Sequence, residues 1–156
     1  MSGSNIARSK VVPRASRTPA RDSTRPLAGL QILVVEDHAD SRDFLEEILT
    51  YYGAAVVSAA SATEAMQIVA RVTPSIVIAD VAMPYHDGVW LLKELRQHQA
   101  VTGQYVPVVA LTASVSRPLK VDFDAVLIKP CPIEKVCRVI QQLTDVAPPQ
   151  PQKRRA

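Results

Sequence analysis

The sequence predicts an α/β protein built on a doubly wound parallel sheet of five strands. Short apolar runs alternate along the chain with longer segments whose apolar residues recur at helical spacing. The runs are apolar at nearly every position, as in strands that are covered on both faces. Strands and helices that alternate in this way form a parallel sheet with helices on both sides.

The first strand is expected at 31–35, where four aliphatic residues follow one another. A helix follows over about 40–52, because its apolar residues fall on one face, and Gly53 is placed to end it as a C-terminal cap. A second, shorter strand is expected at 55–59.

The second helix has a clear starting signal. Ser61 and Glu64 have the spacing of a capping box, in which each side chain satisfies a backbone N–H group at the helix start. The helix extends to about residue 72, and Pro74 closes it because proline cannot continue a helix. The third strand follows at 75–80 and ends in Asp80.

The second half of the chain repeats the pattern with one irregular connection. The expected elements are a helix over 89–99, strands over 106–111 and 125–128, and a helix over 132–144. Only residues 113–123 connect the fourth strand to the fifth, and Pro118 lies in the middle of them. A parallel crossover normally needs about ten or more residues and usually contains a helix. We therefore expect the fourth helix to be shortened or absent.

Charge divides the 156 residues into three regions. Residues 1–29 hold six basic and one acidic side chain, residues 147–156 hold three basic ones, and residues 30–146 hold nine basic and fourteen acidic ones. The outer regions have too few apolar residues to offset the entropy lost on ordering. We expect a disordered basic tail at 1–29, a folded domain at 30–146, and a disordered, Pro-rich basic tail at 147–156.

Composition also limits where the protein acts. The scattered N-terminal arginines favour a solvated linker, and they leave open an acidic partner or a transit peptide. We expect no nucleic-acid partner, because no aromatic residue stands among these arginines. No apolar stretch approaches the roughly 18 residues of a membrane span. Cys131 and Cys137 are interpreted as small buried hydrophobes, so we expect a reducing, cytoplasmic location.

Polar side chains stand where four of the predicted strands end. Glu36 and Asp37 follow the first strand, Asp80 ends the third, and Thr112 and Lys129 follow the last two. The carboxyl ends of parallel strands lie at one edge of a sheet, so these groups are expected in one crevice. Such a set can hold a divalent cation and a phosphoryl group. Each residue alone could be an ordinary surface group, but that does not explain their common position. The remaining candidates, His38, His86 and His98, have no ligand spacing and are interpreted as surface residues.

These residues resemble the receiver domain of bacterial two-component response regulators over about residues 30–145. The resemblance rests on Glu36-Asp37, Asp80, Met83-Pro84, Asp87-Gly88, Thr112 within Ala-Leu-Thr-Ala, and Lys129-Pro130, in that order. It implies a flavodoxin-like sheet with the strand order 2-1-3-4-5. It also implies that Asp80 is the phosphoacceptor, that Lys129 and Thr112 contact phosphoryl oxygens, and that the peptide bond before Pro130 is cis.

Mg²⁺ is the cofactor that the resemblance implies. Its implied ligands are Asp37, Asp80 and the backbone carbonyl of Ala82, with Glu36 holding a metal-bound water. One departure concerns the switch that accompanies Thr112: receiver domains carry an aromatic residue three positions before the lysine, and this chain has Val126 there. The missing aromatic residue and the short crossover affect the same face, so we expect signal output through a modified surface.

The sequence favours a single-domain response regulator. It would accept phosphate from a histidine kinase or a histidine phosphotransferase and act by protein contact or phosphorelay, because no second globular domain follows. It would not be an enzyme beyond its own phosphorylation and dephosphorylation on Asp80, and a homodimer is compatible with the resemblance. The alternative is a phosphorylation-independent adaptor that keeps the receiver fold.

Overall fold

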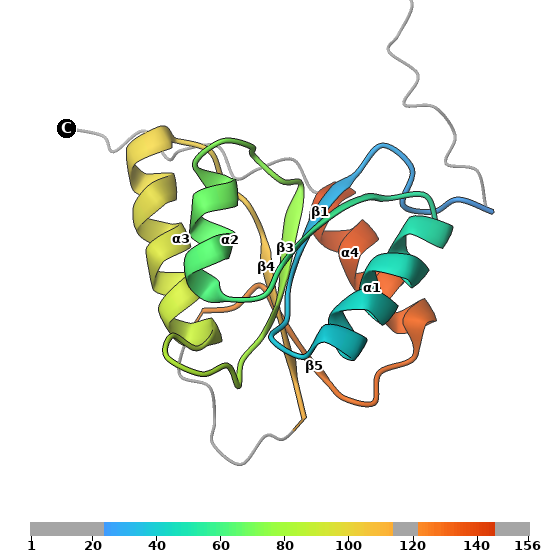
Figure 1. Ribbon diagram of the computed structural model, residues 1–156. Coiled ribbons are helices and arrows are strands. Elements are labelled where there is room, and N and C mark those ends of the chain that lie inside the picture. Colours follow the sequence, from blue (N-terminus) through green and yellow to red (C-terminus); the bar gives the residue numbers. More distant parts are fainter. Residues whose placement is uncertain (1–23, 114–121, 146–156) are drawn as a thin grey trace, which may run out of the picture.

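The structure is a computed structural model that describes residues 24–113 and 122–145. One five-stranded sheet runs through its centre with the strand order β2-β1-β3-β4-β5, and every pairing is parallel, as predicted (Figure 1). The strands are β1 (Gln31–Val35), β2 (Ala55–Ala59), β3 (Ile76–Asp80), β4 (Val108–Thr112) and β5 (Ala125–Ile128).

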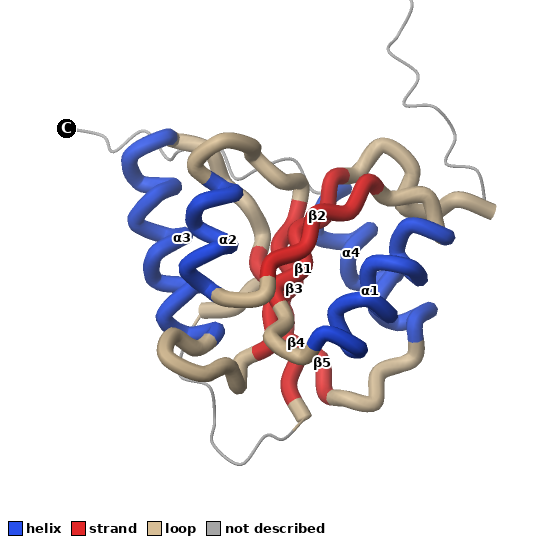
Figure 2. Tube along the Cα trace, in the orientation of Figure 1, coloured by secondary structure: helices blue, strands red, loops and turns tan. Residues whose placement is uncertain are grey.

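Helices cover both faces of the sheet. The helices are α1 (Ala39–Tyr51), α2 (Ala62–Val69), α3 (Gly88–Thr102) and α4 (Ile133–Asp145). Helices α2 and α3 lie on one face, and α1 and α4 lie on the other, so the predicted doubly wound fold is confirmed (Figure 2). None of these helices is long and apolar enough to cross a membrane.

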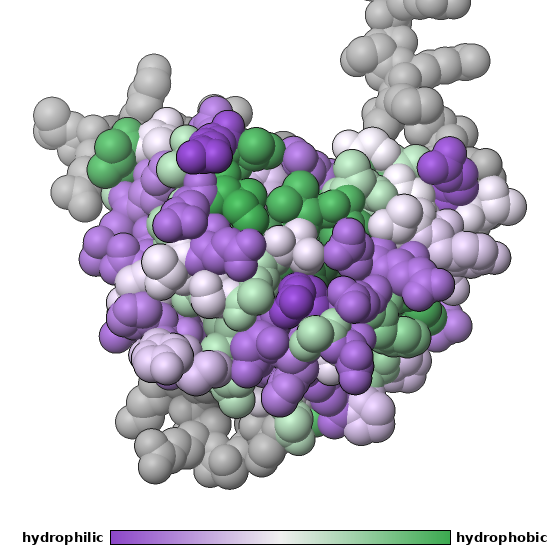
Figure 3. Space-filling view, in the orientation of Figure 1, coloured by the Kyte–Doolittle hydropathy of each residue, from purple (hydrophilic) through white to green (hydrophobic). Residues whose placement is uncertain are grey.

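The two helical layers create two separate hydrophobic cores. Alternate residues of β1 enter different cores: Ile32 and Val34 pack with α1 and α4, whereas Leu33 and Val35 pack with α2 and α3. A central strand buried on both faces is apolar at every position, which is the pattern seen in the sequence. Figure 3 shows apolar side chains exposed between the helical layers, where the edge strand β2 lies.

Local signals set the ends of several elements. The Ser61 hydroxyl accepts a hydrogen bond from the Glu64 backbone N–H at 3.1 Å, and the Glu64 carboxylate accepts one from the Ala60 N–H at 2.8 Å. The predicted capping box is therefore formed, with the second bond one residue earlier than in the standard motif. Gly53, with φ of 104°, follows α1, and Gly103, with φ of 73°, ends α3 later than expected.

The folded domain begins earlier than the expected boundary at residue 30. Leu27 is fully buried in the core beneath α1 and α4, and its N–H donates to the Tyr52 carbonyl at 3.0 Å. The Gln141 side-chain amide donates to the Pro26 carbonyl at 3.3 Å. The tail prediction is thus wrong for residues 24–29, because one leucine packs into the core with residues of distant elements and composition does not reveal such a contact. The remaining tail residues, 1–23 and 146–156, lie outside the described residues.

Leu27→Ala should lower the free energy of unfolding by about 2–3 kcal/mol, because it removes a buried side chain and leaves a cavity. Urea denaturation measures this change. Val101→Ala is the matched control, since Val101 is 87% exposed and its truncation should change stability by less than about 0.5 kcal/mol. Equal losses in both variants would show that Leu27 does not belong to the core.

The crossover between β4 and β5 is described only at its two ends. The expectation of a shortened or absent fourth helix concerns residues 113–123, most of which lie outside the described residues, because 114–121 are not described. The helix labelled α4 follows β5 and corresponds to the last helix predicted at 132–144.

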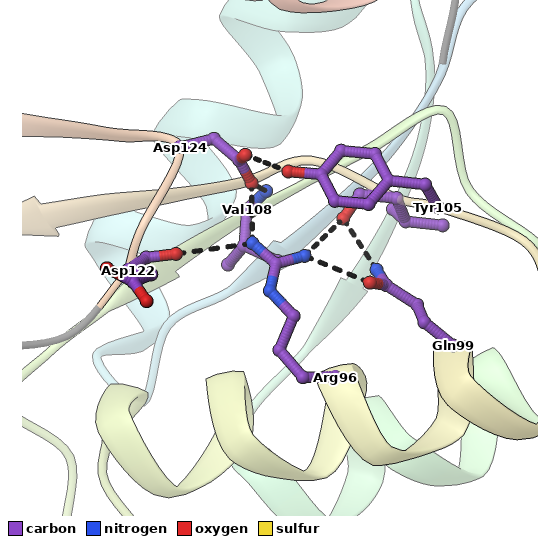
Figure 4. A network of polar contacts seen from close by, with 7 residues as sticks. Arg96, Gln99, Tyr105, Val108, Asp122 and Asp124 are labelled. Carbon is purple, nitrogen blue, oxygen red and sulfur yellow. Dashed lines mark hydrogen bonds and ion pairs between the residues drawn. The ribbon is translucent and has the colours of Figure 1, made fainter. Parts of the chain in front are cut away.

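A polar network fixes the chain where it re-enters the sheet. Asp124 stands just before β5, and its carboxylate accepts hydrogen bonds from Arg96 of α3 at 2.8 Å and from the Val108 N–H at 2.7 Å (Figure 4). The Tyr105 hydroxyl donates to the same carboxylate, and the Arg96 guanidinium lies 5.0 Å from the centre of the Tyr105 ring. These contacts hold the start of the edge strand β5 against β4. The other end of β5 leads to Lys129.

Candidate functional site

The strand ends bring the predicted polar residues to one edge of the sheet. Asp80, the last residue of β3, pairs with Leu111 of β4, and Thr112 pairs with Ile128 of β5. Within the described residues, the buried polar side chains are Glu36, Asp80 and Thr112, which are 1%, 7% and 6% exposed. All three were candidates from the sequence. Burying polar groups costs stability unless they are paired, so their shared location indicates a site.

Lys129 connects two of the buried carboxylates. Its Nζ atom lies 2.8 Å from Glu36 Oε2 and 3.7 Å from Asp80 Oδ2. Partial burial alone would lower the pKa of Lys129, but the hydrogen bond to Glu36 and the charge of Asp80 outweigh burial and raise the pKa. The lysine therefore stays charged and offsets negative charge contributed by two separate strands.

Glu36 is held in place by two donors. Its Oε2 accepts the bond from Lys129, and its Oε1 accepts a bond from the His38 backbone N–H at 3.2 Å. Burial raises the pKa of Glu36, and these two bonds only partly offset that effect, while the charge of Asp80 adds to it. Additional positive charge near Glu36 would therefore stabilise its ionised form.

Asp37 has a carboxylate oxygen suited to a cation. Among the described residues, its Oδ1 atom is the one buried side-chain oxygen or nitrogen atom that has no hydrogen-bond partner. Ligand atoms of Glu36, Asp37 and His38 lie within 4.8 Å of one another. Asp80 is not in this group, but the Lys129 Nζ atom that bonds to Glu36 also lies 3.7 Å from Asp80 Oδ2. Carboxylate oxygens are the ligands that Mg²⁺ prefers, so the residues present fit a divalent cation.

The loop after β3 holds Asp80 through backbone contacts. The Ala82 N–H donates to Asp80 Oδ1 at 3.1 Å, and the Gly88 N–H donates to the Val81 carbonyl at 3.0 Å. A Cβ atom on Gly88 would lie 2.8 Å from the Asp80 carbonyl oxygen, so a side chain there would displace the loop. Asp87 caps α3 by accepting from the Trp90 N–H at 2.9 Å. In the Asp87-Gly88 pair, the aspartate thus caps α3, and the glycine allows α3 to begin close to the Asp80 backbone.

The last strand end has the expected backbone. The peptide bond between Lys129 and Pro130 is cis, and the Lys129 N–H donates to the Thr112 carbonyl at 2.7 Å. Thr112 and Lys129 are therefore neighbours, as predicted. Val126, at the position of the missing aromatic residue, is 41% exposed.

Two residues near the site were not identified from the sequence. Arg42 donates from Nη1 to the Glu36 carbonyl at 2.9 Å and lies 3.4 Å from the Asp37 carbonyl, so it secures the loop after β1. The sequence offered one signal for Arg42: it stands in the first turn of the helix that follows the acidic pair Glu36-Asp37. His38 is exposed, as expected, but a nitrogen of its ring lies within 4.8 Å of carboxylate oxygens of Glu36 and Asp37, which the lack of ligand spacing among the three histidines did not reveal.

A groove of about 680 Å³ adjoins Lys129 on the side of α1 and α4. Apolar side chains of both helices line it, and Phe44 of α1 is 61% exposed there. Cys131 contributes a half-buried thiol to the same groove.

Sequence comparison identifies the family to which this site belongs. The model of the response regulator receiver domain matches residues 32–141, which span the sheet and every site residue described above. The chain belongs to the receiver domain family. The carboxylates, Thr112 and Lys129 thus lie within the matched region, at the carboxyl edge of its sheet.

Relatives of this receiver domain occur in proteins of different size. An uncharacterized 14.6 kDa protein of Leptolyngbya boryana is 36% identical over 128 residues, with 79% of this chain and 96% of that protein covered. Regulator of RpoS from Escherichia coli K12 is 34% identical over 112 residues, which cover 69% of this chain but 32% of that protein. Relatives thus range from one that this chain spans almost completely to one of which it spans about a third.

A solved receiver domain has the same fold. The receiver domain of the sensor histidine kinase PA1611 from Pseudomonas aeruginosa PAO1 is 27% identical, with a TM-score of 0.70, and covers 76% of this chain and 100% of that chain. That structure holds a magnesium ion in its active-site cleft.

Proposed function

We propose that this receiver domain accepts a phosphoryl group on Asp80 from a phosphohistidine of a histidine kinase or a histidine phosphotransferase. The observation that carries the proposal is the bridge from Lys129 to two buried carboxylates that stand at the ends of different strands. Buried acidic groups held beside one lysine are costly to maintain for the fold alone. The same arrangement is suited to balancing the charge of a phosphoryl group.

The proposed transfer uses Asp80 as the nucleophile. An Asp80 oxygen forms a bond to phosphorus while the bond from phosphorus to the donor imidazole nitrogen breaks, and the imidazole keeps the electron pair and takes a proton. The transition state is loose, so the protein mainly has to position the group and balance charge on its oxygens. Lys129 moves from its carboxylate partners to one phosphoryl oxygen, and the Thr112 hydroxyl donates to another.

The proposal includes Mg²⁺ as a cofactor. Asp37, Asp80 and the Ala82 carbonyl would hold it, with Glu36 at a metal-bound water, and the unpaired Asp37 oxygen supports this assignment. When bound, the cation supplies positive charge that stabilises the phosphoryl oxygens in the transition state. Asp37 and Glu36 would position it, and Arg42 would keep their loop in place through its two carbonyl contacts.

Signal output by protein contact or phosphorelay completes the proposal, with no catalysis beyond the chemistry of Asp80. The groove beside Lys129 and the exposed Phe44 offer an apolar surface at which a phosphate donor could dock close to the acceptor. The second candidate is a phosphorylation-independent adaptor, and Val126 favours it. A valine in place of the aromatic residue has no ring that could move inward when Thr112 engages a phosphoryl group.

Phosphorylation by a small phosphodonor tests this proposal. With Mg²⁺ present, intact-mass spectrometry should detect one added phosphoryl group per chain, and a chelator should reduce labelling to the background. The label should disappear under hydroxylamine, which cleaves acyl phosphates. A chain that acquires no label from small phosphodonors or from a panel of phosphorylated histidine phosphotransferases would support the adaptor instead.

Mg²⁺ should also stabilise the fold, because it binds the folded site and relieves repulsion among its carboxylates. At about 100 times the dissociation constant, the expected gain in unfolding free energy is about 2.7 kcal/mol. Thermal denaturation with Mg²⁺ and with chelator measures this difference. Asp37→Asn should lose most of the gain, whereas Asp43→Asn, an α1 residue outside the site, should keep it. A gain of equal size in all three proteins would place the cation elsewhere.

A further inference from the structure

The His38 side chain has no role in the helix that it precedes. His38 is the N-cap residue of α1, but its ring makes no capping hydrogen bond. Its backbone provides the structural contacts: the N–H donates to Glu36 Oε1 at 3.2 Å, and the carbonyl accepts from the Arg42 N–H at 2.9 Å. Ser, Thr, Asp or Asn would cap this helix better. The imidazole is therefore available for another function.

The ring lies beside the acidic pair. A ring nitrogen of His38 and carboxylate oxygens of Glu36 and Asp37 lie within 4.8 Å of one another. Both Glu36 oxygens already accept hydrogen bonds, one from Lys129 and one from the His38 N–H. The Asp37 Oδ1 atom is buried and has no partner among the described residues. An oxygen of Asp37 and a nitrogen of His38 are thus the donors that this triplet offers to a cation.

We propose that His38 is a nitrogen ligand for a cation held at Asp37, which gives this position a preference for divalent cations of the Co²⁺ and Zn²⁺ type over Mg²⁺. Imidazole is a good ligand for these transition metals, whereas Mg²⁺ prefers oxygen ligands and keeps several waters. The inference shares Asp37 with the cation site of the proposed function, and Asp80 is not in the triplet. It rests on the proposed function only for that residue, concerns the choice of metal and does not depend on phosphate transfer.

Metal titration of the full chain tests the role of His38. Isothermal titration calorimetry with Co²⁺ and with Mg²⁺ should show that His38→Gln lowers Co²⁺ affinity by about tenfold or more, while Mg²⁺ affinity changes by less than about twofold. The visible absorption of bound Co²⁺ reports its ligands, so its bands should shift when an oxygen ligand replaces the imidazole. His98→Gln, which changes a histidine of α3 outside the triplet, should leave both affinities and the spectrum unchanged.

His38→Asn separates ligation from folding. Asparagine is a preferred N-cap residue, so the metal-free variant should melt at the same or a higher temperature and should still lose Co²⁺ affinity. The proposal is overturned if wild type does not bind Co²⁺ more tightly than Mg²⁺, if His38→Gln leaves Co²⁺ affinity unchanged, or if it reduces Co²⁺ and Mg²⁺ affinities by the same factor. Failure of Asp80 to accept phosphate would contradict the proposed function alone, because these titrations measure metal binding directly.

Discussion

Asp80→Asn should abolish phosphoryl incorporation from a small phosphodonor. The side chain is 7% exposed, with Oδ1 held by the Ala82 N–H and Oδ2 facing Lys129 at 3.7 Å. An amide keeps the shape of this group but lacks the negative charge that makes the carboxylate a nucleophile. Intact-mass spectrometry should therefore detect the phosphoryl group on wild type and none on the variant.

The matched control for this change is Asp87→Asn in the same loop. Asp87 is exposed and caps α3 through the Trp90 N–H, and asparagine caps a helix about as well as aspartate. This variant should be labelled like wild type. Without cation, Asp80→Asn should change stability little, because it removes both the repulsion between Asp80 and Glu36 and the attraction between Asp80 and Lys129. Equal labelling of the Asp80→Asn variant and wild type would move the acceptor to another residue.

Lys129→Met should slow phosphorylation by about 100-fold, the usual cost of removing one donor that stabilises developing charge. Methionine keeps much of the length of the lysine stem but supplies neither charge nor hydrogen bond. The change also leaves Glu36 buried without its cationic partner. Because Lys129 is partly solvent-exposed, we expect a moderate loss of about 2 kcal/mol in unfolding free energy at neutral pH.

Two further variants separate the catalytic effect of Lys129 from its effect on stability. Adding Glu36→Gln to Lys129→Met removes the unpaired charge, so stability should recover while phosphorylation stays slow. Lys135→Met alters an exposed lysine of α4 and should affect neither quantity. Rates come from the time course of labelling, and stabilities come from urea denaturation. A labelling rate for Lys129→Met equal to that of wild type would exclude a direct role of the lysine in phosphate transfer.

The fold and the main site residues follow from local patterns in the sequence. Strand runs that are apolar at every position indicate burial on both faces, and alternation with helical segments indicates a parallel sheet. In such a sheet the carboxyl ends of the strands share an edge by geometry. Asp80, Thr112 and Lys129 could therefore be assigned to one site, because each stands at a strand end. In the structure Asp80 and Thr112 are buried, and Lys129 lies beside Asp80, which agrees with that assignment.

Tertiary packing alone decided the features that depend on side-chain direction and on contacts between distant residues. Leu27 joined the core because it packs in one cluster with buried residues of α1 and α4, although its neighbours have the composition of a tail. Lys129 pairs with Glu36, 93 positions away, and periodicity carries no information about such a pair. The ring of His38 lies beside the Asp37 carboxylate because the chain turns from β1 into α1 at this point. The sequence by itself thus determined the sheet and the line of polar strand ends, whereas the three-dimensional packing determined which of those groups meet.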